Sequence, residues 1–158
     1  MNIELEINRV KFRLGDPLEG EQLKVARFKK AGIVTKITNQ TPLLGKQFIA
    51  RNCTVTCFRN EFVLYPCRYD YLDEDRRWKT SAFLFYKNER LHRIVIQVTD
   101  GHYAALNFVQ SFQEACENNI GDPARAERRL IKWEDDSNFI KCRLDREHYN
   151  ASLDVMSK

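Results

Sequence analysis

The sequence predicts an α+β fold, in which a mostly antiparallel sheet of about seven to nine strands packs on one main helix. Short apolar runs with a period of two residues recur along the chain and are separated by turn residues, which is typical of strands. One segment, residues 102–119, instead carries apolar residues at helical spacing. The 158 residues, 43% of them hydrophobic, suit a single globular domain over residues 1–158.

The best-defined part of the sequence is a hairpin followed by a helix. Two apolar runs, 83–86 and 91–98, flank Asn88-Glu89, and this spacing predicts a two-residue turn. Such a turn places Phe83 opposite Ile94. The face expected to pack on the helix then holds Phe83, Phe85, His92, Ile94 and Ile96.

The helix expected over 102–119 has a clear apolar stripe and clear ends. Thr99 or Asp100 can cap its first turn, and Gly121 can end it. The stripe recurs at i, i+3, i+4 and i+7 and consists of Ala105, Phe108, Val109, Phe112, Ala115 and Cys116.

The segments before this hairpin are mostly extended. Residues 3–14 alternate in two bursts, which indicates strands, whereas residues 19–31 have the spacing of a short N-terminal helix that ends near Gly32. Residues 47–72 predict a second hairpin, with Arg59-Asn60 as its turn and Cys57 opposite Phe62.

The segments after the helix predict a meander. Residues 124–129 can add a helical turn. Strands are then expected over 130–134, 140–144 and 153–155, with Trp133 and Cys142 among the inward residues.

Composition narrows the class of protein. The net charge of +4 is mildly basic, and no apolar run approaches the ~20 residues that span a bilayer. The N-terminal residues lack the basic and apolar regions of a signal peptide. We therefore expect a cytoplasmic protein without membrane contacts. Self-association through an edge strand is compatible with this class. Pro66 interrupts the hydrogen bonding of its strand, which indicates a strand at a sheet edge, and an edge strand can pair with a second chain.

The five cysteines are expected to be structural thiols, and no metal or cofactor is expected. Cys53 and Cys57 are four residues apart on a predicted strand, roughly 13 Å, which is too far for one zinc ion. The three histidines follow no metal-binding spacing, and no phosphate loop or nucleophile elbow occurs. No catalytic residue is assigned, and the lack of a catalytic motif in the sequence favours a binding protein over an enzyme.

The function predicted first is non-catalytic binding of a protein partner, in the manner of an inhibitor or immunity protein. Tyrosines beside charged residues are typical of protein-binding hot spots. The residues that carry this prediction are Tyr65, Tyr69, Tyr71, Asp73 and Trp78.

Two alternatives stay open at this point. A basic face of the C-terminal meander could bind nucleic acid, because Lys132, Lys141 and Arg143 should share its solvent side. The residues of this alternative are Arg125, Arg129, Lys132, Lys141 and Arg143. The other alternative is a small-ligand binder or enzyme, with a pocket between sheet and helix where His92 meets a carboxylate.

Overall fold

The computed structural model defines most of the chain. The residues that it describes are 1, 3–18, 22, 28–34, 45–64, 68–71, 74–77, 79–99, 102–145 and 150–158. Among these, the backbone alone is described at 28–34, 45–46, 68–71, 74–77, 79 and 102–104.

The predicted fold class is confirmed, since one main helix packs against antiparallel sheets. The largest sheet has eight strands in the order β11-β12-β13-β14-β10-β9-β4-β3. Its strands are β3 (Phe28–Val34), β4 (Gly45–Arg51), β9 (Lys79–Lys87), β10 (Arg90–Thr99), β11 (Arg125–Glu127), β12 (Leu130–Glu134), β13 (Asn138–Leu144) and β14 (Ala151–Ser157). The C-terminal strand β14 lies inside this sheet, between β13 and β10.

Two smaller sheets complete the described strands. A four-stranded sheet has the order β2-β1-β5-β6, and β7 pairs with β8 in a hairpin. These strands are β1 (Leu5–Ile7), β2 (Val10–Phe12), β5 (Val55–Cys57), β6 (Phe62–Leu64), β7 (Arg68–Tyr71) and β8 (Glu74–Arg77).

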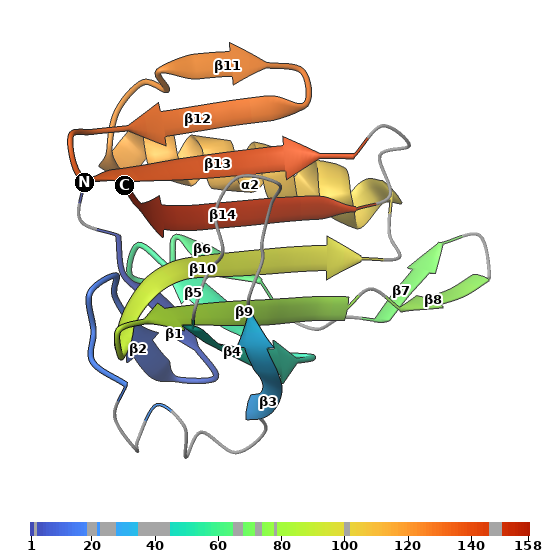
Figure 1. The fold of residues 1–158 in the computed structure, drawn as a ribbon. Helices are drawn as coiled ribbons and strands as arrows, with labels where there is room; N and C mark the ends of the chain where they lie inside the picture. The colour runs from blue at the N-terminus through green and yellow to red at the C-terminus, as the bar shows by residue number, and fades with distance from the viewer. Residues whose placement is uncertain are drawn as a thin grey trace.

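The elements form two layers (Figure 1). The eight-stranded sheet is one layer, and helix α2 (His102–Asn119) lies behind β12, β13 and β14. The four-stranded sheet lies beside the helix, behind β9 and β10. A single cluster of buried apolar side chains joins the layers, because both sheets and the helix contribute to it.

Aromatic rings form the centre of that cluster. Phe112 is fully buried, and its ring lies 5.3 Å from Phe62, 6.1 Å from Phe108 and 6.1 Å from Trp133, measured between centroids. The Trp133 indole also donates to the Gly121 carbonyl at 2.9 Å. These contacts tie the four-stranded sheet, the helix and β12 to one another.

The helix matches its predicted bounds, and its apolar stripe is buried. Beyond its C-terminus, Gly121 adopts a left-handed backbone with φ of 110°. The amides of Ile120 and Gly121 both donate to the Cys116 carbonyl, at 2.7 and 3.2 Å. Glycine suits this position because a Cβ disfavours positive φ.

The central hairpin has the predicted turn but not the predicted register. Asn88 and Glu89 have φ of 49° and 60°, the backbone of a two-residue turn. The pairing then shifts between Leu91 and Arg93, where His92 is an extra residue. Phe83 therefore faces Val95, and the expected pairing with Ile94 is wrong.

The bulge reverses the predicted faces of one strand. Ile94 and Ile96 are buried toward the helix as expected, but the β9 residues buried with them are Ala82, Leu84 and Tyr86. Phe83 and Phe85 instead lie on the opposite face and are half-buried. A shift of one residue moves every side chain of a strand to the other face.

Two helical predictions are wrong at part of their length. Residues 28–31, the end of the expected N-terminal helix, belong to strand β3. Gln22 is helical as expected, and the rest of 19–27 lies outside the described residues. Residues 125–127 form β11 in place of a helical turn, because the backbone of β12 offers them a pairing edge. The second hairpin has the predicted pairing of Cys57 with Phe62 but is shorter than 47–72, because residues 47–51 pair with β9 and residues 68–71 pair with β8.

Replacement of the central ring tests the packing. We expect Phe112→Ala to lower the free energy of unfolding by about 3–5 kcal/mol, because it leaves a cavity between three elements. Gln110→Ala, on the exposed side of the same helix, should change it by less than about 0.5 kcal/mol. Urea unfolding of both variants measures the difference, and equal effects would contradict a central role for Phe112.

Candidate functional site

The residues predicted to bind a protein partner are only partly described. Tyr65, Asp73 and Trp78 lie outside the described residues. Tyr69 and Tyr71 belong to β7, where their backbones are opposite Arg76 and Glu74 of β8. This hairpin pairs with no other described strand.

The basic residues of the nucleic-acid alternative are better defined. Helix α2 and the four-stranded sheet cover one face of the eight-stranded sheet, and we call the opposite face the outer face. Side chains of β12 and β13 alternate between the two faces as predicted. Trp133 and Cys142 are buried inward, whereas Lys132, Lys141 and Arg143 lie on the outer face.

An aromatic ring lies close to the two lysines of this set. Lys132 lies opposite Lys141 in the sheet, and both ammonium groups approach the Phe139 ring, with Nζ 5.8 and 4.4 Å from its centroid. Burial, and then the nearby charges of Arg143 and Lys132, hold the pKa of Lys141 below its usual value. We call Lys132, Phe139, Lys141 and Arg143 the basic patch.

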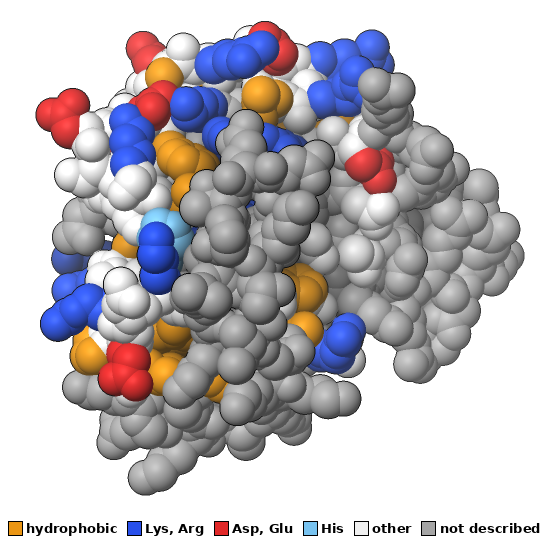
Figure 2. All heavy atoms as spheres, viewed as in Figure 1, with side chains coloured by type: hydrophobic (Ala, Val, Ile, Leu, Met, Phe, Trp, Pro, Cys, Tyr) orange, Lys and Arg blue, Asp and Glu red, His pale blue; other side chains and the backbone are white. Residues whose placement is uncertain are grey.

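Carboxylates neutralise part of this surface. Figure 2 shows Lys and Arg side chains gathered at the top of the molecule, with acidic side chains among them. Glu134 pairs with Lys132 and with Lys158, and hydrogen bonds from these two lysines lower its pKa to about 2. Arg125 pairs with Glu127, with Nε to Oε1 at 2.7 Å.

Not every predicted cation is therefore available to a ligand. Arg125 is opposite Lys132 in the sheet but is paired, and Arg129 lies in the turn between β11 and β12. Lys141 and Arg143 form no ion pair with any described residue. They are the basic-patch cations best able to meet an external anion.

A cavity of about 380 Å³ adjoins the basic patch at the end of β13. Arg143, Ser152 and Gln97 lie in one row across β13, β14 and β10, and all three line it. Asn150 lines it as well and donates to Asp145 at 2.8 Å. Sequence reasoning missed this cavity because its residues are far apart along the chain.

The sequence predicts a pocket between sheet and helix where His92 meets a carboxylate. A second cavity lies between the four-stranded sheet and the C-terminal end of α2, but His92 does not line it. The His92 ring is half-buried on its bulge, with Nδ1 2.7 Å from the Ser157 hydroxyl. Burial, followed by the charges of Lys87 and Arg93, lowers the pKa of His92.

The described cysteines are packing residues. Cys53, Cys57, Cys116 and Cys142 are buried free thiols. Burial raises the pKa of Cys53 to about 11 and those of Cys57 and Cys142 to about 12. Within the described ranges, no group of three His, Cys, Asp or Glu could hold a metal ion. Cys67 lies outside the described residues.

Comparison with protein-family models, curated proteins and solved structures finds no match for this chain. Among the helical residues that the structure describes, no segment is long and apolar enough to cross a bilayer. Any assignment of function therefore depends on the geometry of the surfaces described above.

Thiol reactivity tests the status of the buried cysteines. In a Cys67→Ser variant, we expect no rapid alkylation by iodoacetamide at pH 7.5, because fewer than about one in a thousand of these thiols would be ionised. Unfolding in urea should make all four thiols reactive, and mass spectrometry counts the adducts. Fast modification of one thiol in the folded protein would contradict a purely structural role.

Proposed function

We propose that this chain is a binding protein whose outer sheet face recognises single-stranded nucleic acid. The observation that carries this proposal is Lys141, whose Nζ lies 4.4 Å from the centroid of the half-buried Phe139 ring, with Arg143 two residues further along the same face of β13. Proteins that bind single strands combine cations, which contact phosphates, with aromatic side chains on which bases stack. The basic patch supplies both kinds of group.

The adjoining cavity supports the same proposal. Its volume of about 380 Å³ suits a group the size of a nucleotide, and Gln97, Ser152 and Asn150 offer hydrogen-bonding atoms beside Arg143. A single strand that lies along β13 could place one nucleotide in the cavity and another, further along its backbone, beside Phe139. The acidic neighbours Glu127 and Glu134 limit the number of phosphate contacts, so binding should be modest.

Binding of a labelled single strand tests the proposal. We expect a Lys141→Gln/Arg143→Gln variant to bind more weakly at 50 mM salt. The slope of log affinity against log salt should become less negative by about 1.4, since each phosphate contact contributes ~0.7 for single strands. Fluorescence anisotropy with a labelled oligonucleotide of about 12 nucleotides measures both quantities.

A charge-matched control is available away from the basic patch. Arg9 lies in the turn between β1 and β2, and Lys87 is the last residue of β9. Both are exposed, so Arg9→Gln/Lys87→Gln removes the same charge outside the basic patch. This variant should keep the parent salt dependence. Absence of binding by the parent protein at 50 mM salt, or equal losses in both variants, would exclude the basic patch as a nucleic-acid site.

A protein partner is the second candidate, and the hairpin of β7 and β8, which pairs with no other described strand, favours it. A two-stranded hairpin that no third strand supports is marginally stable in water. A strand edge that no described strand occupies can add a strand from a partner. Tyr69 and Tyr71 lie on β7, so the hairpin combines an available edge with the residue type enriched in hot spots.

Affinity capture followed by hydrogen exchange tests this candidate. A protein retained by the parent chain should be lost with Tyr69→Ala/Tyr71→Ala and retained by the Arg9→Gln/Lys87→Gln control. Addition of the purified captured protein should then slow amide exchange in 68–77, because strand pairing protects the hairpin. Unchanged exchange in those residues, or capture that survives loss of both tyrosines, would count against the hairpin.

A further inference from the structure

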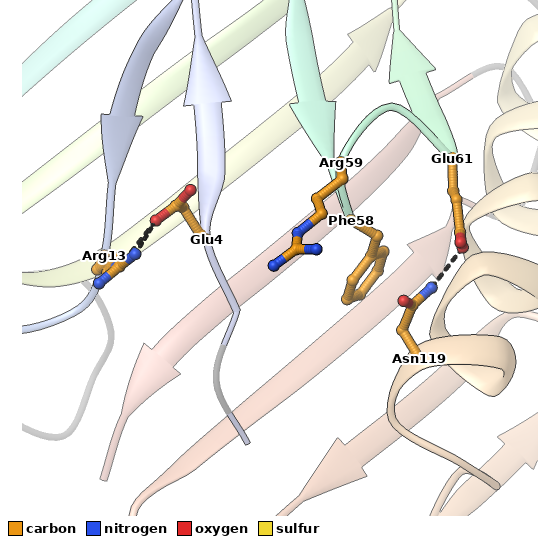
Figure 3. A pocket seen from close by; sticks show the side chains of 6 residues that line it. All are labelled: Glu4, Arg13, Phe58, Arg59, Glu61 and Asn119. Atoms are coloured by element: carbon orange, nitrogen blue, oxygen red, sulfur yellow. Dashed lines mark hydrogen bonds and ion pairs between the residues drawn. The ribbon is translucent and has the colours of Figure 1, made fainter.

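The cavity at the C-terminal end of helix α2 is separate from the basic patch. Its volume is about 460 Å³, within the range of small-molecule sites. Three parts of the chain supply its walls: the segments flanking the β1–β2 hairpin, the turn between β5 and β6, and the last turn of α2 (Figure 3). The residues that line it are Glu4, Arg13, Phe58, Arg59, Glu61 and Asn119.

The turn that carries Arg59 has an unusual backbone. Phe58, Arg59 and Asn60 all have positive φ, of 52°, 54° and 76°. Residues with a Cβ rarely adopt this conformation in succession. Such strain persists where surrounding contacts fix the backbone, and it is concentrated at functional sites.

Contacts on both sides of Arg59 fix the turn. The Phe58 ring packs on Phe112, with centroids 6.4 Å apart. On the other side, Glu61 Oε2 accepts a hydrogen bond of 2.6 Å from Asn119 Nδ2 at the end of the helix. The turn therefore holds Arg59 between Glu4 and Phe58, as the close view shows (Figure 3).

The carboxylates of this cavity have partners, but the Arg59 guanidinium has none among the described residues. Glu4 accepts from Arg13 Nε at 2.5 Å and pairs with Lys11 at 3.4 Å. The hydrogen bond from Arg13 is the main reason that the pKa of Glu4 is lowered. Neither Glu4 nor Glu61 bonds to Arg59, so its donors remain open to the cavity.

We propose that this cavity binds a small organic oxyanion, a carboxylate or phosphate, on Arg59. A guanidinium presents parallel N–H donors that match either group in a bidentate manner. The Phe58 ring beside it can cover an apolar part of the ligand, and the free oxygen of Glu61 can accept from an N–H or O–H group. A bare inorganic anion would use only the first of these contacts.

Titration with model anions tests the proposal. Phenyl phosphate, benzoate and inorganic phosphate are added to isotope-labelled protein, and amide chemical shifts are followed. We expect saturable shifts in residues 58–61 and near Asn119 with at least one of the two aromatic anions. The preferred aromatic anion distinguishes a phosphate site from a carboxylate site. Inorganic phosphate should bind more weakly because it lacks a ring.

A matched pair of variants keeps the test specific. Arg59→Gln should weaken binding at least about tenfold, because it removes the charged donors. Arg9→Gln is the control, since Arg9 is also an exposed turn arginine with positive φ, 68°, but does not line the cavity. The absence of a saturable shift with both aromatic anions up to roughly 10 mM would overturn the proposal, because weaker binding lies outside the millimolar range of simple ligands. Equal loss in both variants, or inorganic phosphate binding as tightly as phenyl phosphate, would also overturn it.

Discussion

The packing of Phe112 is the contact on which the rest of this structure depends. Its ring meets Phe62 from the four-stranded sheet and Trp133 from the eight-stranded sheet, so one side chain joins both sheets to the helix. Phe58 extends the same contact to the strained turn. The cavity at Arg59 is therefore built on the core, because the ring that forms one of its walls also packs on Phe112.

The parts of the fold set by local chemistry could be predicted from the sequence. The helix bounds, the Asn88-Glu89 turn and the pairing of Cys57 with Phe62 depend on neighbouring residues or on simple alternation. The bulge at His92 could not be predicted, because nothing in the local pattern distinguishes an extra residue from a regular strand. Residues 28–31 show a related limit: their apolar spacing suits a helix, yet pairing with β4 makes them a strand.

The candidate sites also have parts that could be predicted from the sequence and parts that could not. Alternation placed Lys132, Lys141 and Arg143 on one face, and it also carried the unused signal that Phe139 lies on that face, two residues before Lys141. Pairing of Glu134 with Lys158 could not be inferred, because those residues are brought together only by the sheet. The cavity at Arg59 depends on three separated segments, so no spacing in the sequence indicates it.

The position of β14 has a consequence for how the protein is made. This strand alone connects β13 with β10 in the sheet, so residues 151–157 must be synthesised before the two halves can join. During translation the β11–β13 half and the β10–β9–β4–β3 half each present an unpaired edge. Exposed edges promote aggregation, and chains stalled or cleaved before 151 would keep both of them. Strand β14 thus makes continuity of the sheet depend on residues 151–157, which follow every other described strand in the chain.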